Sequence, residues 1–441
     1  MSFIGVDLGA TFIKAAWLDP RSDAVRDERR VAFPAFEPQP PGRREVPVEP
    51  IFQSTLQLLE GLLRSRNGDC QGIFLCGQMH GFVFVQQGGS GGGNFISWQD
   101  RRCLEAGQDG RSHFDVAKEV LGPSLISRLG NEFRPGLPAA TLHGMARAGT
   151  LPDNSMPLAL ADYVAVRLTS APPVTHVTNA AAHGLFDLQA GRWSSEALER
   201  LGLQGLRMPT LAVANEPLGF FSFGRGKIPV FPPVGDQQAA LLGAGLAPGE
   251  LSINIGTGSQ VACLAEKPQE GPWQMRPYFD NLWLRTVTHL PAGRALNRLV
   301  FLFCQLAEEQ GTPIKDPWKL ISQLVAHANP KSIRVNLSFF PTVLGSEGAI
   351  QGILEEELEV GALFRASFRN MGENYLRAGL TVSPKGWKSV VFSGGLALKN
   401  EILRSEILRC VGNPHRVSNY PEDTLMGLLA LGKRIKNSSA F

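Results

Sequence analysis

The residues best suited to chemistry lie near the start of the chain, where Asp7 closes an apolar stretch and a glycine turn follows. The stretch 3–18, FIGVDLGATFIKAAWL, predicts a buried strand, a turn at 8–10 and a second strand. Glycine lets a backbone approach a ligand, the turn's amides face outward, and a carboxylate can hold a divalent cation beside them. This combination suits a nucleotide polyphosphate with its magnesium ion, although an Asp before a glycine turn is also an ordinary turn residue.

The same design returns later in the chain. In the stretch 251–266, LSINIGTGSQVACLAE, Asn254 stands where Asp7 stands in the first copy. A third glycine turn follows the apolar run at 390–393 and leads into a helix that we expect over 396–410. Internal similarity at this range indicates two related halves, each offering a phosphate-facing turn to a shared cleft.

Several strands and helices must position these turns. An amphipathic helix is predicted over 49–68 and strands over 72–76 and 82–86. The segment 19–49 is expected to be extended or loop-like, with an irregular hairpin as the alternative. The middle section, 101–175, is expected to be helical, with its clearest helix at 159–170. A small-residue helix should run from Asp236 to near Pro248. Strands that alternate with helices predict an α/β protein.

Composition bounds the size and the partners. The 441 residues suffice for two or three cores, and 43% hydrophobic with 19% charged residues is typical of a soluble enzyme. A net charge of +3 is too small to indicate a nucleic-acid or membrane partner. The six cysteines are scattered without a C-x-x-C pair, which favours reduced thiols and a cytoplasmic protein. Breakers between Gly224 and Pro233 predict a boundary that divides the chain into domains 1–232 and 233–441.

Short motifs in a fixed order carry a family resemblance. They are GVDLGATFIK, GQMHG (77–81), WQDRR (98–102), DYVAVRLT (162–169), VGDQQAA (234–240), INIGTGSQ (253–260), FPTVLG (340–345), SGGLALKN (393–400) and PEDTLMGLLALG (421–432). With them the chain resembles the FGGY carbohydrate kinases, and within that family it is most similar to sedoheptulokinases. The resemblance implies an α/β, two-domain actin-like ATPase (ribonuclease-H-like) fold with the active site in the interdomain cleft.

The resemblance also implies an activity. It is the ATP-dependent phosphorylation of a terminal primary hydroxyl of a ketose, with sedoheptulose to sedoheptulose 7-phosphate expected first and Mg²⁺ as the metal. A pentulose kinase of the xylulokinase type is the alternative, and a non-catalytic sugar-binding sensor on the same fold is a second. The expected partners are thus a small sugar and ATP. A homodimer is the expectation from the general prevalence of small symmetric assemblies.

The family motifs assign roles to individual residues. By resemblance, Asp236 takes the proton of the attacking sugar hydroxyl, although its place before a helix also suits a plain N-terminal cap. Asp7 resembles the metal-associated Asp. Lys14 points at phosphate if its register is inward and is otherwise an exposed strand lysine. The nucleotide set implied by the motifs is Gly9, Thr11, Lys14, Gly256, Thr257, Gly258, Gly394, Gly395 and Asn400; an exposed helical Asn is the alternative for Asn400.

Sugar choice is expected to depend mostly on the turn after residue 77. By resemblance, Met79-His80 is a ketose-kinase pair where glycerol kinases carry Arg-Glu, and His80 offers one donor and one acceptor to hydroxyls. The full sugar-binding set is Gln78, Met79, His80, Trp98, Asp100, Asp236 and Gln237. Trp98 also suits the core and His80 a structural role. Ala10, where the family usually has Thr, and 345–347, where it often has Gly-Glu-Arg, depart from the pattern.

Overall fold

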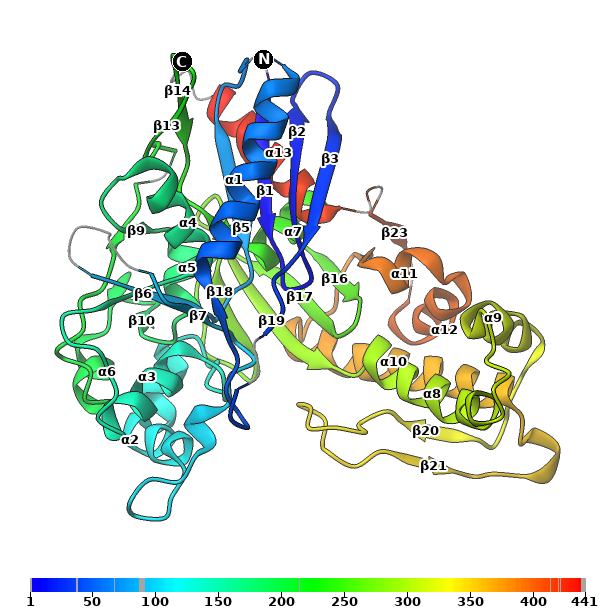
Figure 1. The fold of residues 1–441 in the computed structure, drawn as a ribbon. Helices are drawn as coiled ribbons and strands as arrows, with labels where there is room; N and C mark the ends of the chain where they lie inside the picture. The colour runs from blue at the N-terminus through cyan, green and yellow to red at the C-terminus, as the bar shows by residue number, and fades with distance from the viewer. Residues whose placement is uncertain are drawn as a thin grey trace. The chain divides into compact units, whose positions relative to one another are not determined.

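The computed structural model describes residues 2–36, 39–66, 68–86, 92–213, 215–412, 414–418, 420 and 422–437 (Figure 1). The chain forms two compact units. Unit 1 comprises Met1–Gly243, Glu266–Trp283 and Glu422–Phe441, and unit 2 comprises Ala244–Ala265 and Leu284–Pro421. This division by compactness differs from the boundary expected at residues 232 and 233, which remains a prediction about the functional halves.

A mixed sheet forms the core of unit 1, in the strand order β13-β14-β5-β1-β2-β3, with β15 also paired to β5. Every residue of β1 is buried because the strand lies inside the sheet with covered faces. β1 pairs antiparallel with β2 and parallel with β5. These strands are β1 (Phe3–Leu8), β2 (Phe12–Asp19), β3 (Ala24–Ala32), β5 (Ile73–Gly77), β13 (Gly219–Phe223), β14 (Gly226–Val230) and β15 (Val234–Gly235).

The segment 19–49, expected to be extended or loop-like with an irregular hairpin as the alternative, forms one arm of a hairpin over part of its length. β3 is a nine-residue strand that pairs antiparallel with β2. Its sequence, AVRDERRVA, carries little apolar periodicity because β3 is an edge strand whose side chains are largely solvated.

Helices α1 (Val48–Ser65) and α13 (Asp423–Asn437) both contact β2, and α13 also packs on α7 (Asp236–Gly243). The α7–α13 contact is close: a Cβ on Gly427 would lie 1.9 Å from the Ala239 carbonyl oxygen. α7 ends before the predicted Pro248 because Gly245 adopts a left-handed conformation, φ 67°. No helix in the described part of the chain is long and apolar enough to cross a membrane.

Smaller elements complete unit 1. They are β4 (Glu45–Pro47), β6 (Phe82–Val85), β7 (Asn94–Ile96), η1 (Arg102–Leu104), α2 (His113–Arg128), α3 (Pro138–Arg147), β8 (Met156–Leu158), α4 (Leu160–Thr169), β9 (Val174–Thr175), α5 (Val177–Ala181), β10 (Phe186–Asp187), β11 (Arg192–Trp193), α6 (Ser195–Arg200), β12 (Thr210–Leu211) and β18 (Gln274–Pro277). The helices predicted over 49–68 and 159–170 correspond to α1 and α4.

Unit 2 repeats the central topology of unit 1. Its strands lie in the order β19-β17-β16-β22-β23, with β16 antiparallel to β17 and parallel to β22. Asn254 pairs with Gln260 and Ser393, as Asp7 pairs with Lys14 and Cys76 in unit 1. The internal repeat predicted from the sequence is thus present. The strands are β16 (Glu250–Ile255), β17 (Ser259–Ala265), β19 (Trp283–Leu290), β20 (Arg334–Asn336), β21 (Ala349–Gln351), β22 (Ser389–Ser393) and β23 (His415–Val417).

The helix predicted over 396–410 is divided in two at Asn400. This residue is extended (φ −123°, ψ 97°), and its side chain accepts a 2.9 Å hydrogen bond from the Leu403 N–H, which caps the second helix. The helices of unit 2 are α8 (Gly293–Glu309), α9 (Pro317–His327), η2 (Glu355–Glu357), α10 (Val360–Val382), α11 (Gly395–Lys399) and α12 (Glu401–Val411).

Candidate active site

Two carboxylates stand at the ends of strands that flank β5. On one side of β5, Asp7 of β1 pairs with Cys76. On the other side, Val234 of β15 pairs with the same Cys76, and the chain then turns into α7 at Asp236. Neighbouring strands lie about 4.8 Å apart, so Asp7 and Asp236 project from one sheet edge across the width of a single strand. The structure places both acids in unit 1, whereas the predicted domains 1–232 and 233–441 separate them.

The Asp236 carboxylate is half-buried, and it accepts a 2.7 Å hydrogen bond from the Gln237 N–H at the start of α7. Burial, and after it the negative charge of Asp7, raise its pKa to about 7, while the Arg276 guanidinium acts in the opposite direction. Asp236 thus contacts the start of α7, and its role as a plain N-terminal cap stays an alternative prediction. A pKa near neutrality also suits a group that must accept a proton at physiological pH.

Asp7 is buried, with 5% of its surface exposed. One carboxylate oxygen accepts a 2.9 Å hydrogen bond from the Thr424 hydroxyl, and the other lies 3.7 Å from the Cys76 thiol. Burial raises the pKa of Asp7 although Lys14 opposes the shift. Among the described residues, one oxygen of this buried carboxylate has only a weak thiol donor, which fits a divalent cation.

The Lys14 side chain is paired with an acidic residue. Its ammonium group forms an ion pair with Glu422, and its charge also acts on Asp7. The contact between Lys14 and phosphate therefore stays a prediction. Sequence reasoning missed Glu422 and Thr424, which precede and open α13; an acidic residue and a threonine beside a helix start are common enough to carry no signal.

The turn between β5 and β6 carries Gln78, Met79 and His80, all buried. The Gln78 Nε2 atom has no hydrogen-bond partner within the described residues. His80 takes a left-handed conformation, φ 66°, and its Nδ1 lies 2.9 Å from the Ala182 carbonyl oxygen. Burial lowers the pKa of His80 to about 3, so the ring is neutral. Because a carbonyl only accepts, Nδ1–H donates to it and Nε2 remains an acceptor.

Helix α5 holds both the His80 ring and the turn before Asp236. The Gly235 N–H donates a 3.1 Å hydrogen bond to the Thr178 hydroxyl. Asn179 donates a 3.1 Å hydrogen bond to the Pro233 carbonyl, and Ala182, directly after the helix, accepts the bond from His80. The turn that carries Asp236 and the His80 ring are therefore both held by one short helix. The segment THVTNAAAHG contains no pattern from which this role could be predicted.

Gln237 is buried and joins the same region through Arg276. The Arg276 guanidinium donates to Gln237 Oε1, and its Nη1 lies 3.8 Å from the Met79 sulfur. Its Nη2 donates a 2.7 Å hydrogen bond to Glu132, which lies 3.4 Å from His80 Nε2. The structure thus brings four of the predicted sugar residues, 78–80 and 237, near two that the sequence did not indicate.

Trp98 and Asp100 are placed differently. Trp98 is half-buried. Asp100 is fully buried, and its carboxylate accepts hydrogen bonds from the Arg102 side chain (2.8 and 2.9 Å) and from the Arg44 N–H (2.8 Å). A direct contact between Asp100 and a sugar hydroxyl remains a prediction, one that these bonds disfavour because they occupy both oxygens.

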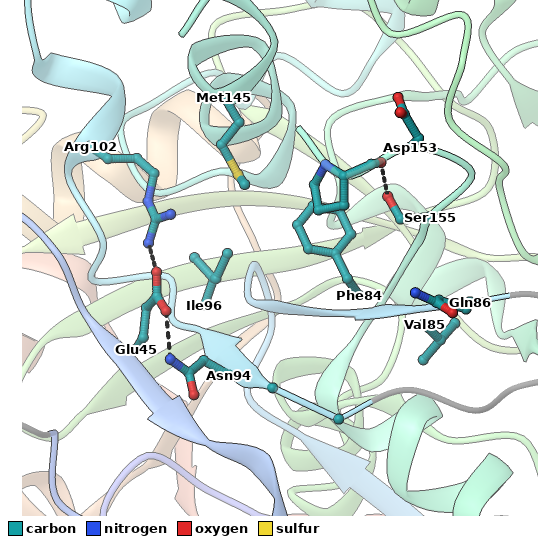
Figure 2. A pocket seen from close by; sticks show the side chains of 13 residues that line it. Glu45, Phe84, Val85, Gln86, Asn94, Ile96, Arg102, Met145, Asp153 and Ser155 are labelled. Atoms are coloured by element: carbon teal, nitrogen blue, oxygen red, sulfur yellow. Dashed lines mark hydrogen bonds and ion pairs between the residues drawn. The ribbon is translucent and has the colours of Figure 1, made fainter. Parts of the chain in front are cut away.

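Arg102 continues this network into a cavity of about 620 Å³ in unit 1. Figure 2 shows Arg102 paired with Glu45, which in turn accepts a hydrogen bond from Asn94. None of the predicted catalytic or sugar-binding side chains lines this cavity, so we assign no chemistry to it.

A cavity of about 420 Å³ in unit 2 collects the nucleotide residues predicted there. Gly256 and Thr257 line it from the β16–β17 turn, and Gly395 and Asn400 line it from α11 and its end. Gly258 and Gly394 shape the two turns: Gly258 accepts a 2.9 Å hydrogen bond from Gly256 N–H. A Cβ on Gly394 (φ 84°) would lie 2.6 Å from the Ile255 oxygen. The cavity also has Gly293, Asn297, Trp318, Ser322, Leu396 and Lys399 in its wall, none of which was predicted.

The first glycine turn lies in unit 1, between β1 and β2. Gly9 is half-buried, and a Cβ added to it would lie 3.8 Å from the Asp7 carboxylate. Thr11 is exposed. Gly9 therefore lies beside Asp7, and Thr11 stands in the same turn before β2. The contact of both residues with nucleotide phosphate stays a prediction.

Comparison with known proteins shows which family shares these features. Residues 2–243 match the model of the N-terminal domain of the FGGY family of carbohydrate kinases. The sedoheptulokinases of Mus musculus and Homo sapiens are each 27% identical to this chain, over 466 and 462 residues that cover 93% of both sequences. The crystal structure of xylulose kinase from Rhodospirillum rubrum matches with a TM-score of 0.85 at 18% identity, covering 100% of this chain and 91% of that one. The predicted two-domain actin-like ATPase fold is thereby confirmed.

Proposed function

The chain belongs to the FGGY family of carbohydrate kinases and is an ATP-dependent sugar kinase, and on that premise we propose that its acceptor is the terminal primary hydroxyl of a ketose. Sedoheptulose, giving sedoheptulose 7-phosphate, is the first candidate because relatives that align over 93% of the chain are sedoheptulokinases. A pentulose of the xylulose type is the second. The proposal further places the protein in the cytoplasm, as a homodimer.

The observation that carries the mechanism is the placement of Asp236. Its carboxylate stands at a strand end, has a pKa of about 7 and lies near the buried side chains of the 78–80 turn and Gln237. In the proposed reaction Asp236 orients the attacking hydroxyl and accepts its proton late, as the bond to the γ-phosphorus forms and the bond to the leaving ADP oxygen breaks. Such loose phosphoryl transfer depends chiefly on positioning and charge neutralisation.

Asp7 is the proposed contact to Mg²⁺. No group of three metal-ligating side chains occurs among the described residues, so the ion would be held by the Asp7 carboxylate together with water and phosphate oxygens. When bound, magnesium neutralises phosphate charge. The Thr424 hydroxyl orients the carboxylate for this contact.

The sugar is proposed to bind at the 78–80 turn. His80 Nε2 would accept a hydrogen bond from one hydroxyl, the Gln78 amide N–H would donate to another, and Met79 would pack against carbon atoms. Trp98 would offer an aromatic face to the C–H groups of the sugar. Asp100 would contribute indirectly, by holding the Arg102 side chain in place. The nucleotide is proposed to occupy the 420 Å³ cavity of unit 2.

A coupled ADP-release assay tests the proposal. Sedoheptulose, xylulose, ribulose, fructose and glycerol are compared with a reaction that lacks sugar. The proposal requires ADP release that depends on a ketose. Stabilisation by a ketose without ADP formation would instead identify a sugar-binding sensor, and hydrolysis that ignores every sugar would contradict both.

The activity should depend on pH through Asp236. Proton acceptance requires the ionised carboxylate, so kcat/KM for the sugar should fall roughly tenfold per pH unit below the carboxyl's pKa of about 7. The measurement is the pH–rate profile between pH 5.5 and 9 with saturating ATP. A profile that is flat from pH 6 to 8 would contradict this role of Asp236.

Gly395 offers a test of the nucleotide cavity. A Cβ at this position would meet no atom within 4 Å, so Gly395→Val should fold normally while its side chain narrows the cavity. We expect ATP affinity to fall by about tenfold or more, as measured by equilibrium titration, because an added side chain displaces a ligand from a preformed pocket. The matched control is Gly205→Val, which also has open space around its Cβ but lies in unit 1. Equal ATP affinity in the two variants would show that the nucleotide does not bind in this cavity.

A further inference from the structure

Arg276 is a buried arginine that no sequence motif indicated. It lies on β18, and 7% of its side chain is exposed. Its Nε atom has no hydrogen-bond partner within the described residues. A guanidinium removed from water in this way must be compensated by its neighbours, so the partners of Arg276 define what it does.

Apart from Gln274 on the same strand, those partners come from three segments that are far apart in the chain. Nη1 donates to Gln237 at the start of α7 and lies 3.8 Å from the Met79 sulfur after β5. Nη2 donates a 2.7 Å hydrogen bond to Glu132 and a 3.1 Å hydrogen bond to Gln274. Glu132 then lies 3.4 Å from His80 Nε2. The planar guanidinium therefore connects two of the residues proposed to contact the sugar, Gln237 and Met79, and Glu132 places it next to His80.

Arg276 also acts on the proposed base by charge. Asp7 disfavours the ionised form of Asp236, whereas Arg276 favours it. The other titratable neighbours contribute little charge: His80 is neutral, and burial keeps the Cys76 thiol protonated. Glu132 carries a negative charge but is paired with Arg276 and lies 3.4 Å from Arg134 Nε. Removal of Arg276 would thus leave the two acids facing each other without this cation.

We propose that Arg276 is the positioning residue of the sugar site: its guanidinium, held by Glu132, fixes Gln237 and Met79 in one arrangement beside the His80 ring. The inference rests on the proposed function, since the same residues are proposed to bind the ketose. The Gln78 amide, next to Met79, and Arg276 Nε are both buried donors that have no acceptor in the part of the chain that the structure describes. This is the polarity that a polyhydroxylated ligand satisfies.

Two substitutions separate charge from geometry. Arg276→Met removes the positive charge and the hydrogen bonds, so KM for the ketose should rise about tenfold or more. The pH at which kcat/KM falls on the acid side of its profile (the acid limb) should rise by about half a pH unit or more. Arg276→Lys keeps the positive charge but loses the planar guanidinium that bonds several partners at once. KM should therefore rise while the acid limb stays near its wild-type position. KM for ATP should change less than twofold in either variant. Arg128→Met is the control, because it breaks ion pairs with Asp187 and Glu196 in the same unit.

The outcomes distinguish this inference from the proposed function. If the wild type turns over a ketose but Arg276→Met has the wild-type KM and acid limb, the role of Arg276 is overturned and the proposed kinase function is retained. If no sugar supports ADP release, the readout becomes the rise in Tm that sedoheptulose causes. Loss of that rise in Arg276→Met but not in Arg128→Met supports the inference, and an unchanged rise overturns it. Should Arg276→Met not fold, the KM and acid limb of Arg276→Lys decide.

Discussion

Asp236→Asn is expected to lower kcat for ketose-dependent ADP release by about 10³-fold, within the 10²–10⁴ range that a positioned acid or base contributes. Asparagine keeps the size and the hydrogen bond to the Gln237 N–H but cannot accept a proton. Nucleotide binding should be nearly unchanged, because the residues that line the proposed nucleotide cavity belong to unit 2. The coupled assay gives kcat, and a titration with ATP gives the affinity.

The same substitution should stabilise the protein, which separates loss of the base from misfolding. The pKa of Asp236 rises from 3.8 to about 7 on folding, so the folded state holds the proton more tightly than the unfolded state. This group therefore lowers the free energy of unfolding as pH rises from about 4 to 7, and the cost is fully present above pH 7. Asp236→Asn removes the cost, and its Tm at pH 8 should exceed the wild-type value by roughly 1–3 °C. Near pH 4 the difference should vanish.

A variant that retained ketose turnover would remove Asp236 from the mechanism. One that lost both turnover and Tm would instead indicate a damaged fold. Asp23→Asn is a suitable control, because Asp23 is an exposed acid of unit 1 that pairs with Lys433 at the surface. It should leave both kcat and Tm near their wild-type values.

The sequence predicted those elements whose burial leaves a clear periodic pattern. β1 and β5 are continuous apolar runs, and α1 places its leucines on one face, so each was located to within a few residues. The bounds of β3 within the segment 19–49 were not predicted, because edge strands need no apolar side chains. The break at Asn400 was not predicted, because an asparagine inside a helical pattern is usually an exposed residue. Here its side-chain oxygen Oδ1 caps α12.

The residues of the candidate site also fall into those that the sequence indicated and those that it did not. Asp7, Asp236 and the glycine turns precede or follow apolar strands, where polar residues stand out, and the internal repeat aligned Asn254 with Asp7 correctly. Arg276 and Glu132 gave no such signal, since a lone charged residue in a short strand or a loop is usually solvated. Their importance arises only from tertiary contacts between distant segments. Asp100 shows the reverse case: its type suggested a sugar ligand, yet its oxygens bind Arg102 and Arg44.

Asp7→Asn should lower kcat by about 10²–10³-fold at physiological magnesium and raise the Mg²⁺ concentration needed for half-maximal activity about tenfold or more. Asparagine preserves the hydrogen bond from Thr424 but removes the negative charge that attracts the cation. Burial disfavours the carboxylate at this position, and Lys14 and Thr424 offset only part of that cost, so a bound cation would stabilise the charge further. The measurement is ADP release as a function of Mg²⁺ at fixed ATP.

The Asp7→Asn variant should also melt at a higher temperature than the wild type without Mg²⁺, since the buried charge is gone. Thr424→Val distinguishes orientation from charge: it leaves the carboxylate but removes its 2.9 Å hydrogen bond, so the Mg²⁺ requirement should shift by less than in Asp7→Asn. Wild-type Mg²⁺ dependence in Asp7→Asn would mean that the ion is held by phosphate oxygens and water alone. Asp7 would then serve only to orient Lys14 and Thr424 at the end of β1.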